Sequence, residues 1–321
     1  MFLQKRVING KSYNYYEHSF RIGNKVKKAS FIINKNKEGY NDKIIKKIAI
    51  ARASYFKEHF KTYFTLKEMF EIETEKIYYQ IFYNLLDEKS KKEIFDEFIR
   101  LFLANSMELE GSTITPQLAE DIERNNQKTK FSGTASVSKK IILPESDILL
   151  YNNSKKVLLN SMDDEFRSVV QFKHLHKEIY KNIYLHAGEF KTNNNTFGYL
   201  EKAKTASPDN VKKELKKILQ NYKRKKIYPF LKPFLFHLDY QKVHPFADGN
   251  SRLGRIILIT QMFKLNYPPI IFKGDMGFQI RETLVEYCNN NHLDFCRLSL
   301  EEYLKTSKKF WRPMIKKFLF L

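Results

Sequence analysis

Several features are scarce in this chain of 321 residues. Only two cysteines are present, Cys288 and Cys296, so the sequence offers neither a disulfide framework nor the paired spacing of a cysteine metal site. The 11 glycines and 9 prolines are too few for long disordered segments. No run reaches the roughly 20 apolar residues of a membrane-spanning helix, and the N-terminal residues lack the pattern of a secretory signal. We therefore expect a globular, cytoplasmic protein without a membrane partner.

Positive charge is in large excess. The chain has 57 Lys and Arg residues against 36 Asp and Glu residues, a formal net charge of +21 and a pI near 9.6. This balance suits a nucleic-acid partner. The lysines are scattered, however, and clusters such as those at 212–217 and 223–226 are typical of solvated helix faces. A basic surface also attracts polyanionic nucleotides, so we give nucleic-acid binding the smaller weight.

The hydrophobic periodicity predicts a mainly α fold with two small β-hairpins. Residues 12–33 favour one hairpin, which turns at Gly23-Asn24, and residues 190–202 favour a shorter one. Thr65 with Glu68, and Ser90 with Glu93, have the spacing of helix capping boxes. Residues 125–140 show no periodicity and are predicted to form a loop. Helices are predicted to start near residues 41, 65, 90, 116, 147, 163, 207, 229, 250, 275, 294 and 305.

The order of these elements suggests four regions: a β-hairpin appendage (1–40), a helical region (41–144), a core (145–304) and a C-terminal helix (305–321). The helical region contains a helix at about 90–111 that ends in ANSMELEGS. Gly111 fits the left-handed position after a helix end. Glu110 then lies on the last turn, where the helix dipole disfavours a carboxylate. Taken alone, this segment is most simply an exposed acid before a capping glycine.

The chemistry of the chain concentrates in residues 244–255, which read HPFADGNSRLGR. The apolar residues 256–259 come next, so the polar run is predicted to be a loop that leads into a buried helix. A helix N-terminus presents unpaired N–H groups that favour a bound anion. Asp248-Gly249-Asn250 allows successive N–H groups to converge on such an anion, and Asn250 is suited to cap the helix. Taken singly, each of these residues is explained most simply by a structural role.

Taken together, the same residues point to a bound polyphosphate. Arg252 lies in the first turn of the helix, where a positive charge opposes the dipole unless an anion lies between them. Asp248 is a hard oxygen ligand of the kind that Mg²⁺ combines with phosphate oxygens, and His244 has the pKa range of a general base. This combination describes phosphoryl or nucleotidyl transfer. A zinc hydrolase has less support because no second histidine has ligand spacing, and a Walker-type loop is absent.

The stretch resembles the signature of Fic-domain proteins. It matches that signature at His244, Pro245, Phe246, Asp248, Gly249, Asn250, Arg252 and Arg255, and departs from it at Ser251, where the family most often has glycine. Residues 188–191 resemble the turn before the family's β-hairpin flap, and residues 267–269 resemble the segment after its motif helix. The resemblance covers roughly residues 145–300. It implies a helical Fic core with a β-hairpin flap, preceded by an extension found in many bacterial and archaeal members.

The resemblance implies a protein adenylyltransferase, which transfers AMP from ATP to a Tyr, Thr or Ser hydroxyl of a target protein. His244 would be the general base, and Asp248 would bind Mg²⁺. Gly249, Asn250 and Ser251 would hold the α- and β-phosphates. Arg252 and Arg255 would hold the β- and γ-phosphates. The flap residues Phe197, Gly198, Tyr199 and Leu200 would pair with an extended segment of the target.

The family also gives the segment 106–111 a role. Self-inhibited members carry Ser/Thr-x-x-x-Glu-Gly/Asn on a helix before the core, and Ser106, Glu110 and Gly111 fit that pattern. Glu110 would then pair with Arg255 in place of the γ-phosphate, because an Arg fork grips a carboxylate as readily as a phosphate. Removal of AMP and transfer of another phosphate-containing group stay open, as do a homodimer and self-modification. The non-enzymatic alternative is a basic nucleic-acid-binding regulator.

Overall fold

A computed structural model describes the chain apart from residues 1, 9–10, 33–37, 129–142, 163–164, 167, 198–199, 225, 289–292 and 320–321. The strands are β1 (Phe2–Ile8), β2 (Lys11–Ile22), β3 (Lys25–Ile32), β4 (Thr196–Phe197) and β5 (Leu200–Lys204). The α-helices are α1 (Glu38–His59), α2 (Leu66–Leu85), α3 (Glu88–Glu108), α4 (Pro116–Lys128), α5 (Glu145–Ser161), α6 (Val169–Ile179), α7 (Val211–Arg224), α8 (Leu231–Val243), α9 (Asn250–Lys264), α10 (Gly277–Cys288), α11 (Leu293–Thr306) and α12 (Arg312–Leu319). The predicted mainly α class is confirmed.

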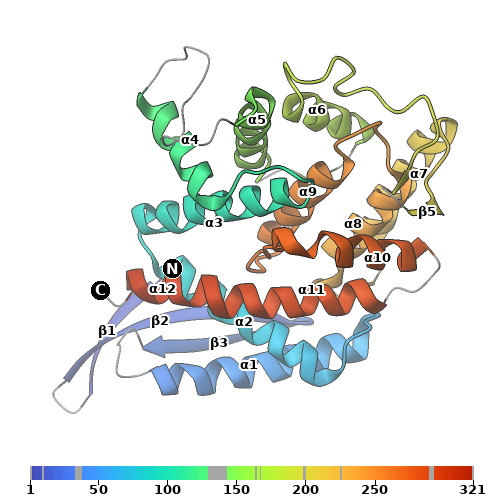
Figure 1. Cartoon of the computed structure of the whole chain (residues 1–321). Coiled ribbons are helices and arrows are strands. Elements are labelled where there is room, and N and C mark those ends of the chain that lie inside the picture. Colours follow the sequence, from blue (N-terminus) through green and yellow to red (C-terminus); the bar gives the residue numbers. More distant parts are fainter. Residues whose placement is uncertain are drawn as a thin grey trace.

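The elements are arranged in layers (Figure 1). The N-terminal sheet and α1 lie at one side, α11 and α12 run across the middle of the view, and α3 to α10 lie beyond them. One apolar core runs through these layers, and the predicted division into four regions stays a prediction. Among the described helices, none combines the length and the apolar character needed to cross a bilayer.

The N-terminal sheet has the strand order β1-β2-β3, with both pairs antiparallel. The predicted hairpin is the β2–β3 pair, which turns at Gly23 with a φ of +59°. A side chain on Gly23 would meet the ring of Tyr55 at 2.7 Å, so glycine is needed for both its backbone and its size. Strand β1 was not predicted. The buried side chains of the sheet, including Phe20 and Phe31, join the core.

A buried carboxylate ties the N-terminal helices to the second half of the chain. Glu73 on α2 accepts hydrogen bonds from Arg52 Nε on α1 (2.6 Å) and from the hydroxyls of Tyr228 (2.7 Å) and Tyr267 (3.2 Å). Burial acts to raise the pKa of Glu73, but the charges of Arg52 and Lys76 outweigh burial and lower it. The carboxylate is therefore ionised and paired, as a buried charge must be.

The C-terminal region packs against the same layer. A short π-helical segment (Ser307–Trp311) links α11 to α12 and buries Trp311, whose indole N–H donates to the Pro269 carbonyl oxygen at 2.8 Å. The Trp311 ring lies 5.0 Å from the rings of Tyr79 on α2 and Phe98 on α3. These contacts fix α3 between the C-terminal helices and the rest of the core.

Several helix boundaries differ from the prediction. The capping box at Thr65 and Glu68 is confirmed. The next helix begins at Glu88 because Asp87, rather than Ser90, is its N-cap and accepts from the Ser90 N–H at 2.7 Å. Helix α4 continues to Lys128, so residues 125–128 are helical although they were predicted to be loop. The rest of that predicted loop lies outside the described residues.

Candidate active site

The loop between α8 and α9 changes direction sharply at both ends. His244 comes directly after α8 and has a left-handed backbone conformation (φ 48°, ψ 63°), which residues other than glycine rarely adopt. Its N–H donates to the Tyr240 carbonyl at 3.0 Å. Gly249 precedes α9 with a φ of +79°, and a Cβ on it would lie 2.3 Å from the Tyr180 ring. The Asp-Gly-Asn sequence places glycine where both the backbone and the space require it.

Phe246 anchors this loop in the core. Its side chain is fully buried and stacks on the ring of His176 from α6, with centroids 3.9 Å apart and planes 8° from parallel. The Asn250 amide accepts from the Phe246 N–H (2.9 Å) and donates to the Phe246 carbonyl (2.8 Å). The prediction that Asn250 caps α9 is therefore wrong: Gly249 is the N-cap, and the amide is used within the loop.

His176 is a functional neighbour that the sequence reasoning missed. Its Nδ1 accepts from the Gly188 N–H at 2.9 Å, so Nε2 carries the proton and donates to the Asp248 carbonyl at 2.9 Å. Burial lowers the pKa of His176, which keeps the ring neutral and this pattern intact. The one sequence feature that indicates burial of His176 is its position on the apolar face of α6, together with Phe172 and Ile179.

Lys191 connects the predicted flap to the end of α8. Its ammonium donates to Asn195 Oδ1 (2.6 Å), Thr205 Oγ1 (2.8 Å) and the Val243 carbonyl (3.3 Å). Burial lowers its pKa to about 8. The predicted hairpin exists as the antiparallel pair β4–β5, in which Phe197 pairs with Leu200. Gly198 and Tyr199 lie outside the described residues.

Arg255 is buried on α9 and faces α3. Its Nε donates to Ser106 Oγ and one Nη to the Ser106 carbonyl oxygen, both at 2.8 Å. The same Nη lies 2.9 Å from Glu110 Oε1. Burial lowers the pKa of Arg255, and the Glu110 charge opposes that shift. Gly111 comes next with a φ of +86°, as predicted for the residue after the helix end.

Arg252, three residues before Arg255 on α9, contacts Tyr180. Its Nη1 donates to the Tyr180 hydroxyl at 2.7 Å, and Tyr180 and the Glu110 carboxylate help to raise the pKa of Arg252 against the effect of burial. The buried Nε has no hydrogen-bond partner in the described part of the chain. An unsatisfied charged donor beside a helix N-terminus is a group that an anion would satisfy.

The motif and the end of α3 surround one cleft of about 250 Å³. Its predicted site residues are Glu110, His244, Asp248, Gly249, Asn250, Ser251 and Arg255. Arg252, Ser106 and Gly111 are not part of its lining. Sequence reasoning did not identify Arg281 of α10, which brings a further positive charge to the cleft.

The electrostatics of the cleft favour a neutral base beside an anion site. Burial, and then the charge of Lys191, lower the pKa of His244 to about 4, so the imidazole is unprotonated at neutral pH. Asp248 is exposed, and its Oδ1 accepts from the Gly249 N–H at 2.7 Å. No group of three or more His, Cys, Asp or Glu residues that could hold a metal occurs among the described residues. A single carboxylate fits a cation such as Mg²⁺, which takes its other ligands from phosphates and water.

Comparison with known proteins finds a family match that includes the α8–α9 loop of this cleft. Residues 167–262 match the Fic/DOC family. The protein adenylyltransferase Fic of Nematostella vectensis is 23% identical over 197 residues, which are 59% of this chain and 43% of that protein. The protein adenylyltransferase fic-1 of Caenorhabditis elegans is 29% identical over 140 residues, 42% of this chain and 25% of that protein. The chain thus spans less than half the length of these curated relatives.

Solved structures give the same result for the fold. Fic-1 (residues 134–508) from C. elegans superposes with a TM-score of 0.63 at 16% identity, covering 88% of this chain and 86% of that one. A Fic domain-containing signalling protein from Bacteroides thetaiotaomicron superposes with a TM-score of 0.61 at 20% identity, covering 77% and 97%. The predicted Fic-type fold is confirmed. The stretch that matches the Fic/DOC family, residues 167–262, includes the HPFADGNSRLGR loop near its C-terminal end.

Proposed function

We propose that this chain is a protein adenylyltransferase that transfers AMP from ATP to a Tyr, Thr or Ser hydroxyl of a target protein. The observation that carries the proposal is the cleft itself, which combines a neutral His244, an exposed Asp248 and a buried Arg255 at the N-terminal end of α9. The two curated relatives named above are both called protein adenylyltransferases. The cleft has the parts that their reaction needs.

In the proposed reaction, His244 accepts the proton of the target hydroxyl. The hydroxyl oxygen attacks the α-phosphorus of ATP, the bond from that phosphorus to the oxygen that bridges the α- and β-phosphates breaks, and pyrophosphate leaves. His244 is unprotonated at neutral pH, which is the form in which a general base accepts a proton. The left-handed backbone at His244 aims the imidazole into the cleft at the end of α8.

The phosphates would lie on the N-terminal turn of α9. Gly249, Asn250 and Ser251 would bind the α- and β-phosphates at the positive end of the helix. Arg252 and Arg255 would bind the β- and γ-phosphates, and the unsatisfied Nε of Arg252 supports a phosphate partner. Asp248 would hold Mg²⁺, which when bound neutralises phosphate charge and supports the departure of pyrophosphate.

We further propose that Glu110 inhibits this reaction. Its carboxylate lies 2.9 Å from one Nη of Arg255, and Ser106 accepts from the same Nη and from Nε at 2.8 Å. A γ-phosphate would compete with Glu110 for the same fork. ATP would then bind with its γ-phosphate displaced and its α-phosphorus out of line with the attacking hydroxyl. Gly111 would allow the chain to turn away directly after the inhibitory glutamate.

The target would enter along the flap. An extended segment would add a strand to β4–β5 through main-chain hydrogen bonds, with Phe197, Gly198, Tyr199 and Leu200 as its contacts. Lys191 would hold this flap at a fixed distance from His244, since it bonds both Asn195 before β4 and the end of α8. Self-modification, a homodimer and a cytoplasmic location belong to the same proposal.

Incorporation of labelled AMP tests the proposal. The chain with Glu110→Gly is incubated with ATP labelled on the α-phosphate and a cell lysate, and proteins are separated by electrophoresis. Adding His244→Ala to that variant should reduce the labelling by roughly 10²–10⁴-fold, the usual contribution of a general base. Unchanged labelling would remove His244 from the reaction.

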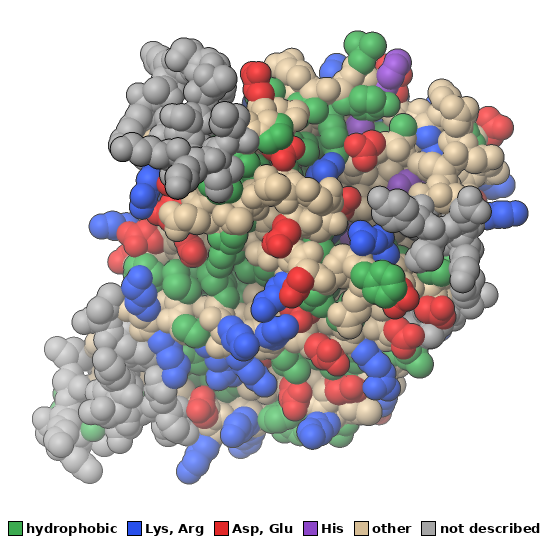
Figure 2. Space-filling model, viewed as in Figure 1, with side chains coloured by type: hydrophobic (Ala, Val, Ile, Leu, Met, Phe, Trp, Pro, Cys, Tyr) green, Lys and Arg blue, Asp and Glu red, His purple; other side chains and the backbone are tan. Residues whose placement is uncertain are grey.

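A second candidate is removal of AMP from a modified protein. The Glu110 carboxylate faces the same cleft as His244 and Asp248, where it is placed to orient a water molecule for attack on an AMP–protein bond. Release of labelled AMP from a pre-modified lysate by the unaltered chain, and its loss with Glu110→Gly, would favour this direction. Nucleic-acid binding has less support, because basic and acidic side chains are interspersed over the face shown in Figure 2.

A further inference from the structure

Helix α8 carries a second cavity on the side that does not face the motif cleft. His237 and Gln241 of α8 line the motif cleft. Lys232, Leu235 and Asp239 succeed one another at helical spacing on another face and line a cavity of about 410 Å³ between α8, α7, α10 and the segment before α2. One helix thus connects the reaction site to this cavity.

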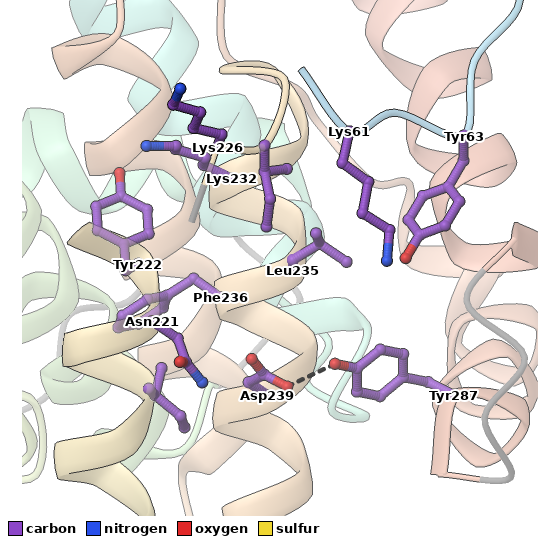
Figure 3. A pocket seen from close by; sticks show the side chains of 12 residues that line it. Lys61, Tyr63, Asn221, Tyr222, Lys226, Lys232, Leu235, Phe236, Asp239 and Tyr287 are labelled. Atoms are coloured by element: carbon purple, nitrogen blue, oxygen red, sulfur yellow. Dashed lines mark hydrogen bonds between the residues drawn. The ribbon is translucent and has the colours of Figure 1, made fainter. Parts of the chain in front are cut away.

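The walls of the cavity are aromatic. Tyr222 comes from α7, Tyr63 from the segment before α2 and Tyr287 from α10, and Figure 3 shows their rings around the central space. At the base, the Tyr287 hydroxyl donates to Asp239 Oδ1 at 2.5 Å, so this carboxylate is engaged by a neighbour. Flat aromatic walls of this kind accept an apolar or aromatic side chain.

The rim of the cavity is positive. Lys61, Lys226 and Lys232 stand around the same space in Figure 3. The ammonium of Lys61 lies 5.9 Å from the Tyr63 ring centre, and that of Lys232 lies 5.9 Å from the Tyr222 ring centre. The backbone keeps the two sides together, since the Lys61 N–H donates to the Lys226 carbonyl at 3.0 Å. The rim therefore attracts carboxylates while the interior accepts a ring.

This cavity continues into a depression of about 520 Å³ that reaches the flap. The two share Ile218, Asn221 and Asp239, and we call them together the α7–α8 groove. Its far end includes Lys204, the last residue of β5. Lys213 and Lys242 add positive charge along the way, whereas the acidic Glu214 is paired with Lys217 at 2.6 Å.

We propose that the α7–α8 groove binds an acidic segment of the target protein, with an aromatic side chain in the cavity and carboxylates on the lysine rim. The inference rests on the proposed function, because it extends a target strand held on β5 past Lys204 into the groove. A protein segment fits better than a polynucleotide, since Asp239 and Glu214 interrupt the lysines along the groove. A peptide can place its carboxylates at the lysine rim alone, whereas a polynucleotide carries a phosphate at every position.

Direct binding tests the groove without requiring catalysis. The probe is a fluorescein-labelled random copolymer of Glu and Tyr, measured by fluorescence anisotropy at about 0.15 M salt, where long-range attraction is screened. The triple variant Lys61→Glu, Lys226→Glu and Lys232→Glu should weaken binding roughly tenfold, because three attractions become repulsions. The matched control carries Lys43→Glu, Lys46→Glu and Lys47→Glu on the exposed face of α1 and should bind within about twofold of the unaltered chain.

Each outcome decides the matter. Equal weakening in the groove and control variants would show that net charge alone binds the copolymer, and would overturn the proposal. Equal affinity for polyglutamate without tyrosine would overturn the aromatic anchor, and displacement of the copolymer by oligothymidylate at equal concentration would favour nucleic acid instead. A circular dichroism spectrum equal to that of the unaltered chain excludes misfolding of the triple variant. The milder double variant Lys61→Ala and Lys226→Ala should also weaken binding of the copolymer, by a smaller factor.

The result is separable from the proposed reaction. Groove-dependent copolymer binding without any AMP incorporation by the Glu110→Gly variant would leave the groove in place and reject the reaction. If AMP is incorporated into the copolymer and the groove variant leaves the KM for the copolymer unchanged, the reaction is supported and the groove is rejected. The proposal expects the groove variant to raise that KM roughly tenfold and to leave kcat within about twofold.

Discussion

Replacing Glu110 by glycine removes the carboxylate from Arg255 and leaves the rest of the cleft in place. The Glu110 side chain is 27% exposed and lies at the end of α3, whereas the Arg255 side chain is only 7% exposed. The variant keeps both Ser106 hydrogen bonds to Arg255, so the guanidinium stays oriented while one of its donors becomes available. A γ-phosphate then no longer competes with an internal carboxylate.

The size of the effect depends on the bond that is lost. Hydrogen bonds to charged groups contribute about 1.5–3 kcal/mol. The Glu110–Arg255 pair should not exceed this range, because the partly exposed Glu110 keeps some contact with water. A difference of about 1.4 kcal/mol is a tenfold change in an equilibrium constant. We therefore expect the affinity for ATP in its reactive pose, and hence kcat/KM for AMP transfer, to rise roughly 10–150-fold.

The assay compares the initial rate of AMP incorporation at several ATP concentrations. Glu110→Gln keeps the side-chain volume and loses the charge, so it should give a rise of the same sign but smaller. Glu108→Gly is the matched control, because Glu108 precedes the same helix end and lies outside the cleft. Equal rates for the unaltered chain and Glu110→Gly, with measurable activity in both, would refute the inhibitory role of Glu110.

Three further results are expected. Gly249→Ala should lower the free energy of unfolding, measured in urea, by about 2–4 kcal/mol through backbone strain and contact with Tyr180. Gly111 has a similar φ but open space around it, so Gly111→Ala should lower that free energy by only about 1 kcal/mol. Equal losses in the two variants would contradict the steric argument. Because burial lowers the pKa of His237 to about 4, the unfolded chain takes up protons first as the pH falls from about 6.5 to 4. Stability should therefore decline over that window, by at most about 3 kcal/mol from this group, and His237→Gln should flatten the decline. Chelation of divalent cations by EDTA should stop AMP incorporation, and added Mg²⁺ should restore it. Full activity in EDTA would show that the reaction needs no Mg²⁺.

Much of the site was predictable because its residues are contiguous. The turn at Gly249, the start of α9 and the helix end at Gly111 result from local backbone preferences. The capping box at Thr65 is local in the same sense. Short-range rules were sufficient for these features.

The remaining features depend on tertiary packing, and those at His176 and Glu73 depend on partners far away in the chain. Nothing local to His176 indicates that its ring supports Phe246, which is 70 positions further on. Asn250 was assigned to the helix cap because that is the local preference, but the buried loop offered its amide two backbone partners. Buried Glu73 resembles a surface residue of α2 until Tyr228 and Tyr267 fold onto it. Tertiary packing, which the sequence pattern does not encode position by position, decided these cases.

The position of the label on ATP distinguishes transfer of AMP from transfer of the terminal phosphate. The Glu110→Gly variant and a lysate are incubated in parallel with ATP labelled on the α-phosphate and with ATP labelled on the γ-phosphate. Protein adenylylation predicts that protein bands acquire the α-label only, that the γ-label leaves as pyrophosphate, and that His244→Ala removes the bands. Transfer of the γ-label to protein, or α-labelling that persists with His244→Ala, would contradict the account.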